Sequence, residues 1–367
     1  GILNQYLQDK LPDCVERKPV NQLIHKIKLY KATHPNRTIR FFKTDYSSFY
    51  DNIDRKRLIQ QLKDRDIDSR AINLVRDAIE NPTCGGTRVE AEAAVVEPYG
   101  IPQGLSISNL LSSLYVREID EEMKKTSELF IRYVDDIIIL QPFQEDFDSL
   151  TQNYADKINL HLQLNPDKTK YGILGVDELE FLGYSFTDKG VTVKRTNVTN
   201  FLNRIAKECL NFRRLYKNKV LRPNYLEDDE VFVHTRLFLL DFSLKGIKVN
   251  GKYYGWLHHF QEIDDIGLLY MIDRRIRKQM LSFLPQKYLK QVSSLRKIYF
   301  QLMDGKADKV VYNYDNLKDV HQRRAYLIKR GLLDQFKTYS DEEIDLLFIR
   351  DREMIIKRNE ANIGHKY

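Results

Sequence analysis

Three acidic residues in this chain have the type and the setting needed to hold a divalent metal ion. Asp45 ends an apolar run that starts at Phe41, and Asp135 and Asp136 lie inside the apolar stretch 130–140. β-branched and aromatic residues favour strands, so this stretch predicts a hairpin with both acids at its turn. Aspartate is common in turns for local hydrogen-bonding reasons, so the pair alone would indicate little. The pair follows Asp45 in the chain at a distance that favours a site shared by all three acids.

A loop sequence between the two acidic segments could approach a bound ligand closely. Tyr99-Gly100-Ile101-Pro102-Gln103-Gly104 combines proline with glycine, which predicts a loop. Gly104 has no side chain that would obstruct the approach of backbone and of the Gln103 amide. Ser106 or Ser108 is a suitable N-cap for a helix that follows the loop.

The chemistry that suits three such acids is nucleotidyl transfer with two metal ions. Mg²⁺ prefers oxygen ligands, usually one or two carboxylates together with phosphates and water. Two ions about 3.5–4 Å apart can activate an attacking hydroxyl and neutralise a pyrophosphate leaving group. Carboxylates about 4 Å apart repel by roughly 4 kcal/mol at an effective dielectric near 20, and bound metal relieves that repulsion. We therefore predict that Asp45 and Asp135 bridge both ions and that Asp136 assists, with Mn²⁺ as the alternative to Mg²⁺.

The elements expected around these acids alternate between strands and helices. A strand ends at Asp45, helical patterns cover 55–80, and a further helix runs roughly from Phe147 to Leu162. With the hairpin and strand-like segments near 181–193, this order describes an α+β domain with helices on one face of an antiparallel sheet. From about residue 197 the pattern is nearly all helical, including one long helix opened by Gly255-Trp256.

Taken together, these segments resemble the palm of a reverse transcriptase over about residues 37–190. Tyr133-Val134-Asp135-Asp136 matches the catalytic hairpin of that family, and Ile101-Pro102-Gln103-Gly104 matches its loop that contacts nucleotide and template. Asp45 with Phe49-Tyr50-Asp51-Asn52-Ile53 looks like the family's first catalytic motif. The resemblance implies a right-hand polymerase fold of fingers, palm and thumb, with RNA-directed DNA polymerase activity that depends on Mg²⁺.

The resemblance also implies roles for individual residues. Its metal ligands would be Asp45, Tyr46, Asp135 and Asp136. Its contacts to the incoming nucleotide would be Arg37, Arg40, Tyr50, Gln103 and Gly104. Tyr50 would lie beneath the sugar 2′ position and exclude ribonucleotides; the alternative is an ordinary aromatic core residue. Lys168 would lie near the triphosphate and donate a proton to the leaving group. The alternative is that Lys168 is only a solvated lysine in a turn.

A second set of residues would contact the primer and the template. Phe181-Leu182-Gly183-Tyr184 resembles the primer grip of group II intron-type enzymes, and the Gly255-Trp256 helix looks like a thumb element. The basic helix 198–219 could follow the backbone of the nucleic acid, although a charged helix face is more often only solvated. The basic residues that we assign to this role are Arg204, Lys207, Arg213 and Arg214.

The resemblance divides the chain into four regions. Residues 1–44 would be partial fingers, 45–195 the palm with finger elements, 196–285 a helical thumb, and 286–367 a C-terminal helical extension. The thumb and the C-terminal region are expected to be all helical. Only 44 residues precede the first acid, so the fingers are expected to be abbreviated or truncated.

Composition agrees with a folded protein that binds nucleic acid. The chain has 367 residues, of which 42% are hydrophobic and 30% are charged. A chain of this length is longer than one hydrophobic core usually supports, so two or more subdomains are expected. A net charge of +7 has the sign needed to hold a phosphate backbone. No apolar run is long enough to cross a bilayer, so no membrane partner is expected. Three scattered cysteines, Cys14, Cys84 and Cys209, fit a reducing cytoplasm rather than a disulfide framework or a zinc site.

The subfamily is narrowed by motifs that the sequence lacks. No histidine-cysteine endonuclease cluster, retron segment or RNase H quartet is evident, so the chain resembles free-standing bacterial reverse transcriptases of the defence-associated, abortive-infection type. The expected partners are an RNA template, the DNA product and dNTPs. The template could be a dedicated noncoding RNA, and the chain could form an oligomer. Two alternatives remain at this stage. One is a template-independent or protein-primed DNA polymerase, and the other is a non-catalytic, maturase-like nucleic-acid-binding protein.

Overall fold

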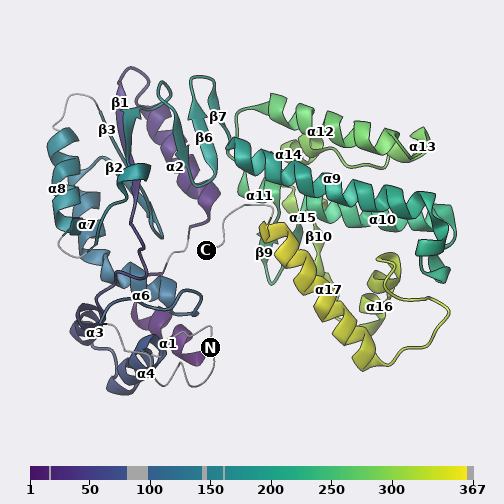
Figure 1. The fold of residues 1–367 in the computed structure, drawn as a ribbon, viewed down its shortest axis with the longest axis horizontal. Coiled ribbons are helices and arrows are strands. Elements are labelled where there is room, and N and C mark those ends of the chain that lie inside the picture. Colours follow the sequence, from purple (N-terminus) through teal and green to yellow (C-terminus); the bar gives the residue numbers. More distant parts are fainter. Residues whose placement is uncertain (16–17, 81–97, 143–146, 160–161, 362–367) are drawn as a thin grey trace. The chain divides into compact units, whose positions relative to one another are not determined.

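Two compact units make up the chain, residues 1–182 and residues 183–367. The computed structural model describes residues 1–15, 18–80, 98–142, 147–159 and 162–361 (Figure 1). Cys84 lies outside these residues. Within them, no helix is both long and apolar enough to cross a membrane.

The first unit is built on a four-stranded antiparallel sheet in the order β2-β3-β1-β4. Its strands are β1 (Ile39–Asp45), β2 (Leu129–Tyr133), β3 (Asp136–Pro142) and β4 (Lys170–Ile173). The four residues 137–140 of β3 are all fully buried, as befits a strand in the interior of the sheet. The apolar runs on either side of the acids thus became neighbouring strands because both could be buried.

Helices surround this sheet. They are α1 (Ile2–Lys10), α2 (Val20–Thr33), α3 (Arg55–Asp64), α4 (Ser69–Glu80), α6 (Ser108–Tyr115), α7 (Arg117–Thr126) and α8 (Phe147–Asn159). Met123 of α7 and Tyr154 of α8 share a buried cluster with Ile137 and Ile139 of β3, so these two helices cover one face of the sheet (Figure 1). A short 3-10 turn, Pro166–Lys168, precedes β4, and strand β5 (Leu179–Phe181) closes the unit.

Helix α6 begins differently from the prediction. Ile107 holds the N-cap position without a side-chain hydrogen bond, and Ser108 is already the first helical residue. The Ser108 hydroxyl instead donates to the carbonyl of Pro102, 2.6 Å away. This serine therefore fastens the Pro-Gln-Gly loop to the helix that follows it.

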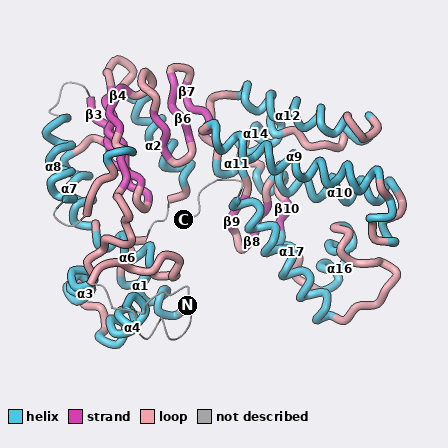
Figure 2. Tube along the Cα trace, in the orientation of Figure 1, coloured by secondary structure: helices cyan, strands magenta, loops and turns pink. Residues whose placement is uncertain are grey.

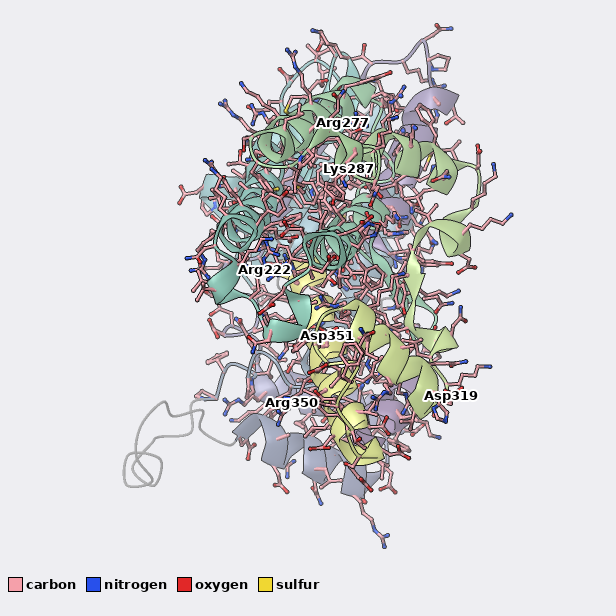
Figure 3. The ribbon with its side chains drawn as sticks, turned by 90° about the vertical axis from the view of Figure 1, so that its right-hand side faces the viewer. Arg222, Arg277, Lys287, Asp319, Arg350 and Asp351 are labelled. Atoms are coloured by element: carbon pink, nitrogen blue, oxygen red, sulfur yellow. The ribbon has the colours of Figure 1, made fainter. Side chains whose placement is uncertain are left out.

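The second unit is mainly helical. It begins with a hairpin of β6 (Tyr184–Thr187) and β7 (Gly190–Val193). Its longer helices are α9 (Arg195–Lys217), α10 (Asp229–Lys245), α12 (Ile266–Leu281), α14 (Leu295–Met303), α16 (Val320–Lys329) and α17 (Asp341–Ala361), and its short ones are α11 (Trp256–His259), α13 (Gln286–Leu289) and α15 (Ala307–Val310). The fully buried Arg222 (labelled in Figure 3) closes the turn between α9 and α10, because it donates to three backbone carbonyls and pairs with Asp229 at 2.7 Å.

The prediction of an all-helical thumb and C-terminal region was wrong in one respect. A second small sheet, in the order β10-β8-β9, lies among the helices (Figure 2). Its strands are β8 (Ile247–Val249), β9 (Lys252–Tyr254) and β10 (Tyr312–Asn313). Asn250 and Gly251 join β8 to β9 with φ of 51° and 74°, the left-handed pair that a tight hairpin turn requires.

The long helix expected from Gly255-Trp256 is also interrupted. Helix α11 covers only four residues, and α12 begins after Asp265, whose carboxylate accepts from the backbone N–H of Leu268 at 3.0 Å. An N-cap of this kind satisfies the free donors of a new helix, so the chain restarts rather than continues.

An aromatic core holds the C-terminal helices together. Phe242, Tyr314, Tyr326 and Phe348 are buried in one cluster. Asp351 of α17 lies beside them and pairs with Arg330 at 2.6 Å, and both side chains are buried (Figure 3). This ion pair ties α17 to the end of α16.

Candidate active site

The sheet of the first unit brings the three predicted acids together. Asp45 is the last residue of β1, Asp136 is the first residue of β3, and the two are direct partners in the antiparallel register. Asp135 lies in the turn between β2 and β3, and its carbonyl accepts from the backbone N–H of Tyr46 at 3.3 Å. The predicted hairpin with the acids at its turn is confirmed, and the end of β1 is hydrogen-bonded to it.

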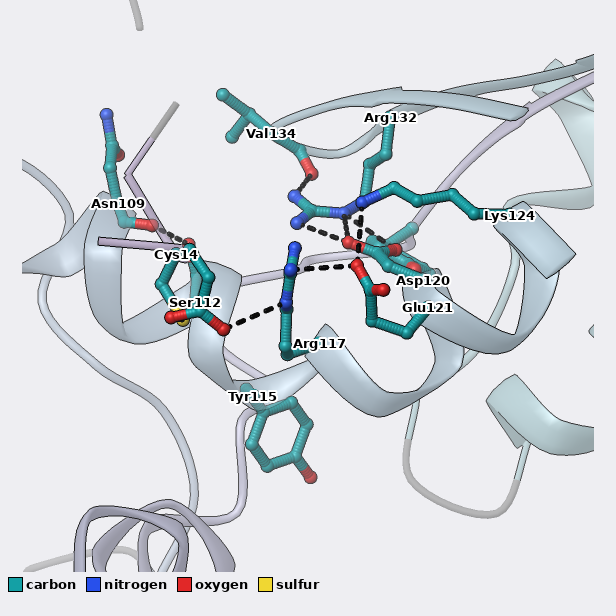
Figure 4. A network of polar contacts seen from close by, with 12 residues as sticks. Cys14, Asn109, Ser112, Tyr115, Arg117, Asp120, Glu121, Lys124, Arg132 and Val134 are labelled. Atoms are coloured by element: carbon teal, nitrogen blue, oxygen red, sulfur yellow. Dashed lines mark hydrogen bonds and ion pairs between the residues drawn. The ribbon is translucent and has the colours of Figure 1, made fainter. Parts of the chain in front are cut away.

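The turn that carries Asp135 has a strained residue and a buried support. Val134 has a φ of 56°, a conformation that β-branched residues seldom adopt. Its carbonyl accepts a hydrogen bond of 2.8 Å from Arg132 Nη1 (Figure 4). Arg132 in turn pairs with Asp120 of α7 at 2.7 Å, and the two side chains are only 8% and 4% exposed. The pair therefore connects α7 to the backbone of the turn that carries Asp135.

Sequence reasoning did not identify Arg132 or Asp120. The available signal was an arginine inside an otherwise apolar strand, because a buried charge requires a partner. The identity of that partner depends on how α7 packs against β2, which spacing along the chain does not reveal.

Two lysines pair with the acids. Lys168 Nζ donates to Asp45 Oδ2, and Lys43 Nζ lies 3.2 Å from Asp136 Oδ1. Asn165, at the start of the turn that carries Lys168, donates its backbone N–H to the carbonyl of Asp45 at 2.8 Å. The backbone thus places Lys168, which was predicted from the resemblance, directly beside the first acid.

The remaining oxygens fit a divalent metal. Asp45 is 2% exposed, and Asp45 Oδ1 and Asp135 Oδ1 are both buried without a hydrogen-bond partner. Burial raises the pKa of Asp135, and the neighbouring Asp136 carboxylate raises it further. Unsatisfied carboxylate oxygens are costly, so a hard cation would stabilise them. Across the described ranges, no three acids, histidines or cysteines form a ready-made metal group, and the lysine pairs occupy two of the acids instead.

Tyr50 and the Pro-Gln-Gly loop lie at the same site. The Tyr50 hydroxyl donates to Asn109 Oδ1 at 2.5 Å, and its carbonyl accepts from the N–H of Ile101 in the loop at 2.9 Å. Burial raises the pKa of Tyr50, and the charge of Asp135 raises it further. Gln103 and Gly104 are exposed. Gly104 has a φ of 94°, a left-handed conformation that favours glycine.

The structure does not bring Arg37 and Arg40 to the acids. Arg40 precedes Asp45 by five residues on β1, which is roughly 17 Å along an extended strand. There it pairs with Asp148 of α8 at 2.7 Å and lies over the ring of Phe147. Arg37 is exposed on the loop before β1. The structure thus gives Arg40 a packing role against α8, and the contacts of both arginines to the nucleotide stay a prediction.

The predicted primer-grip segment is a turn rather than a continuous strand. Leu182 and Gly183 have φ of 49° and 83°, and they separate β5 from β6 at the boundary of the two units. Phe181 and Tyr184 are both buried, and the Tyr184 hydroxyl donates to the carbonyl of His259 at 2.5 Å. Both aromatic side chains thus have internal packing roles.

The basic residues assigned to helix α9 fall into two groups. Arg213 and Arg214 are exposed. Arg204 and Lys207 instead line a cavity inside the second unit. The basic residues that the sequence suggested are therefore divided between this pocket and the surface outside it, and Lys207, which lines the pocket, is itself exposed.

Comparison with known proteins agrees with the geometry of the first unit. The family model described as reverse transcriptase (RNA-dependent DNA polymerase) matches residues 2–186. A comparison with curated proteins found no match.

Among solved structures, the chain is similar to telomerases of two yeasts. Apo telomerase from Candida tropicalis shows 15% identity with a TM-score of 0.46, covering 95% of this chain and 61% of that chain. Telomerase from Candida albicans in complex with the TWJ fragment of telomeric RNA shows 13% identity with a TM-score of 0.47, covering 91% of this chain and 55% of that chain. The chain thus spans less than two thirds of the length of either telomerase.

Proposed function

The chain belongs to the reverse transcriptase family, and we propose that it copies an RNA template into DNA with the help of two Mg²⁺ ions. The observation that carries this proposal is the pairing of Asp45 with Asp136 at the ends of adjacent strands, next to Asp135 in the turn. Asp45 and Asp135 each keep a buried oxygen without a partner, as a metal ligand would.

The residues of this site divide the work of nucleotidyl transfer. Asp45, Asp135 and Asp136 would hold the ions, with the Tyr46 backbone beside them. Bound metal would supply activation of the primer hydroxyl and charge neutralisation at the pyrophosphate. The hydrogen bond to Asp45 raises the pKa of Lys168, so this side chain keeps its proton. It is 58% exposed and free to turn from Asp45 toward the leaving group, to which it would donate that proton.

The choice of substrate follows from Tyr50 and the loop. The Tyr50 ring would lie beneath the sugar and exclude a 2′-hydroxyl, so that dNTPs are used and DNA is the product. The exposed Gln103 and Gly104 would contact the base pair that forms between the nucleotide and the RNA template.

Loss of one metal ligand tests the proposal. Asp135→Ala and Asp45→Ala should each reduce dNTP incorporation on a primed RNA template by about a thousandfold or more, several kcal/mol at the transition state. The measurement is primer extension in Mg²⁺, with Asp148→Ala, an exposed acid on α8, as the matched control. Activity within about tenfold of the native chain in either ligand variant would overturn the metal assignment.

Sequencing of the products tests whether synthesis is templated. Defined RNA templates supplied with all four dNTPs should give complementary DNA. Products whose composition ignores every template, including RNA purified with the chain from its host, would favour a template-independent or protein-primed polymerase. A folded chain that binds RNA but incorporates no nucleotide would favour the maturase-like alternative.

We also propose that this synthesis acts in bacterial antiphage defence, with a dedicated noncoding RNA as the template. Support comes from the resemblance of the palm motifs, followed by a long C-terminal region, to free-standing enzymes of the abortive-infection type. A bacterial host that expresses the native chain should resist phage that lyse the same host expressing Asp135→Ala. Equal plating of phage on both would remove the defence role and leave the polymerase proposal standing.

A further inference from the structure

Arg55 fastens the beginning of the Pro-Gln-Gly loop to α3. It is the first residue of this helix, directly after the N-cap Asp54. Its Nε donates to the carbonyl of Gly100 at 2.5 Å, and its backbone N–H donates to the carbonyl of Pro98 at 3.2 Å. Asp54 and Tyr99 face one another as an isolated antiparallel bridge. The loop is therefore held by both the backbone and the side chain at the start of α3.

The same stretch of chain connects the loop to Tyr50. The backbone N–H of Gly100 donates to the carbonyl of Ile53 at 2.8 Å, and the N–H of Ile101 donates to the carbonyl of Tyr50. Gly100 has a φ of 89°, and a Cβ at this position would lie 3.2 Å from the carbonyl oxygen of Asp51. Glycine thus permits a close approach of the two backbones. Backbone hydrogen bonds therefore join the loop to the segment that carries Tyr50.

The guanidinium group of Arg55 is not fully used by the fold. Its Nη1 is buried and has no hydrogen-bond partner among the described residues. A buried donor without a partner is costly, so an arginine at this position needs an explanation beyond packing. The hydrogen bond from Nε supplies one, because a charged donor holds a carbonyl more strongly than a neutral donor does. The arginine is thus suited to fixing the position of Gly100.

We propose that Arg55 is a positioning residue for nucleotide selection. By holding Gly100, it keeps the exposed Gln103 and the ring of Tyr50 at a constant separation, so that the base pair and the sugar of one nucleotide are contacted together. The inference rests on the proposed polymerase function and extends it to a side chain that need not touch the nucleotide. Small displacements of groups that position a substrate have large effects, so release of the loop should relax the choice of both sugar and base.

Single-nucleotide incorporation by the full chain, on a primed RNA template in Mg²⁺, tests the proposal. Arg55→Met keeps much of the side-chain length but removes every donor, so it should raise the KM of the correct dNTP by about tenfold and change kcat less. It should also lower the preference for dNTPs over rNTPs and for matched over mismatched dNTPs. Arg55→Lys restores a charged donor and should recover part of each loss. Lys56→Met, at the exposed neighbour on the same helix, is the matched control and should behave as the native chain does.

A purely structural role for Arg55 would give a different pattern. Arg55→Met would then contain less active enzyme, which lowers the apparent kcat and leaves KM and both preferences unchanged. That pattern, or native kinetics in Arg55→Met, would overturn the proposal. Gly100→Ala is a second variant, because the added Cβ presses on the backbone of Asp51 and loosens the loop while Arg55 stays intact. It should shift both preferences in the same direction, and native preferences in this variant would also count against the proposal.

Hydrogen exchange gives a readout that does not depend on activity. In Arg55→Met, the amides of Gly100 and Ile101 should exchange about tenfold faster, because a contact that holds the loop is lost. The amides of β3 should exchange as they do in the native chain. Native exchange rates in the loop, or faster exchange throughout the first unit, would contradict the positioning role. A native chain that incorporates no nucleotide would instead refute the polymerase proposal, so the two failures are distinguishable.

Discussion

At the scale of single residues, the site depends on side chains whose charge is set by close neighbours. Asp45 is held by Lys168, Asp136 by Lys43, and the pKa of Asp135 is raised by burial and by Asp136. The sequence identified the acids because their residue types and spacing match a known chemistry. The pairing with Lys43 depends on the strand register, which the sequence alone leaves open.

Tyr50 is the residue whose function can be separated most cleanly from its packing. Tyr50→Ala should increase the use of rNTPs relative to dNTPs by about tenfold or more, because the ring that blocks the 2′-hydroxyl is removed. Tyr50→Phe is the matched control, since it loses only the hydrogen bond to Asn109 and should keep the native preference. The measurement is steady-state incorporation of single rNTPs and dNTPs in Mg²⁺. An unchanged preference in an active Tyr50→Ala variant would count against a sugar gate.

At the scale of elements, the β2–β3 hairpin is held in place by α7. Arg132 of β2 reaches both Asp120 of α7 and the carbonyl of the strained Val134. This connection explains how a turn with a left-handed valine keeps one conformation, because the surrounding contacts determine it.

Disruption of this connection should affect activity and stability together. Asp120→Asn leaves a buried arginine without its countercharge, which typically costs about 3–5 kcal/mol. The expected result is a lower melting temperature and slower primer extension, since Asp135 loses its support. Arg57→Gln, which removes the more exposed pairing of Arg57 with Glu118 of α7, should change both by little. Native stability in Asp120→Asn would show that the buried pair does not hold the turn.

The elements also show where sequence-based prediction succeeds and fails. The apolar runs around Asp45 and Asp136 predicted strands correctly, because burial of such runs in a sheet leaves few alternatives. The β8–β9 hairpin was missed although Asn250-Gly251 is a strong turn signal, since each strand has only three residues within a helical region. The position of Arg40 could not be foreseen, because α8 supplies its partner from a distant segment.

At the scale of the whole molecule, the chain combines a sheet-based unit with a mainly helical unit. Binding of the nucleic-acid backbone by α9 stays a prediction for Arg204, Lys207, Arg213 and Arg214, and of these Lys207, Arg213 and Arg214 are exposed. The pocket lined by residues of α9, α10, α12 and α17 could not be predicted, because its lining comes from segments separated by more than a hundred residues of chain.

Charge reversal on α9 tests that prediction. Arg213→Glu with Arg214→Glu should weaken binding of an RNA–DNA duplex and reduce the slope of log affinity against log salt by about one for each phosphate that is no longer neutralised. The measurement is a binding titration at several salt concentrations. Arg350→Glu, an exposed reversal on α17 (Figure 3), should leave the slope as it is. An unchanged slope in the α9 variant would place the nucleic acid elsewhere.

The two lysines beside the acids affect both the folding of the chain and its affinity for metal ions. A cluster of carboxylates with no cation would oppose folding, yet Lys43 and Lys168 supply internal counterions from the chain itself. The chain therefore carries its own counterions for two of the acids, and binding of a metal ion there would exchange one positive charge for another. The energy gained on binding would be only the difference between two attractions, so such ions are expected to come and go with each substrate rather than remain permanently bound.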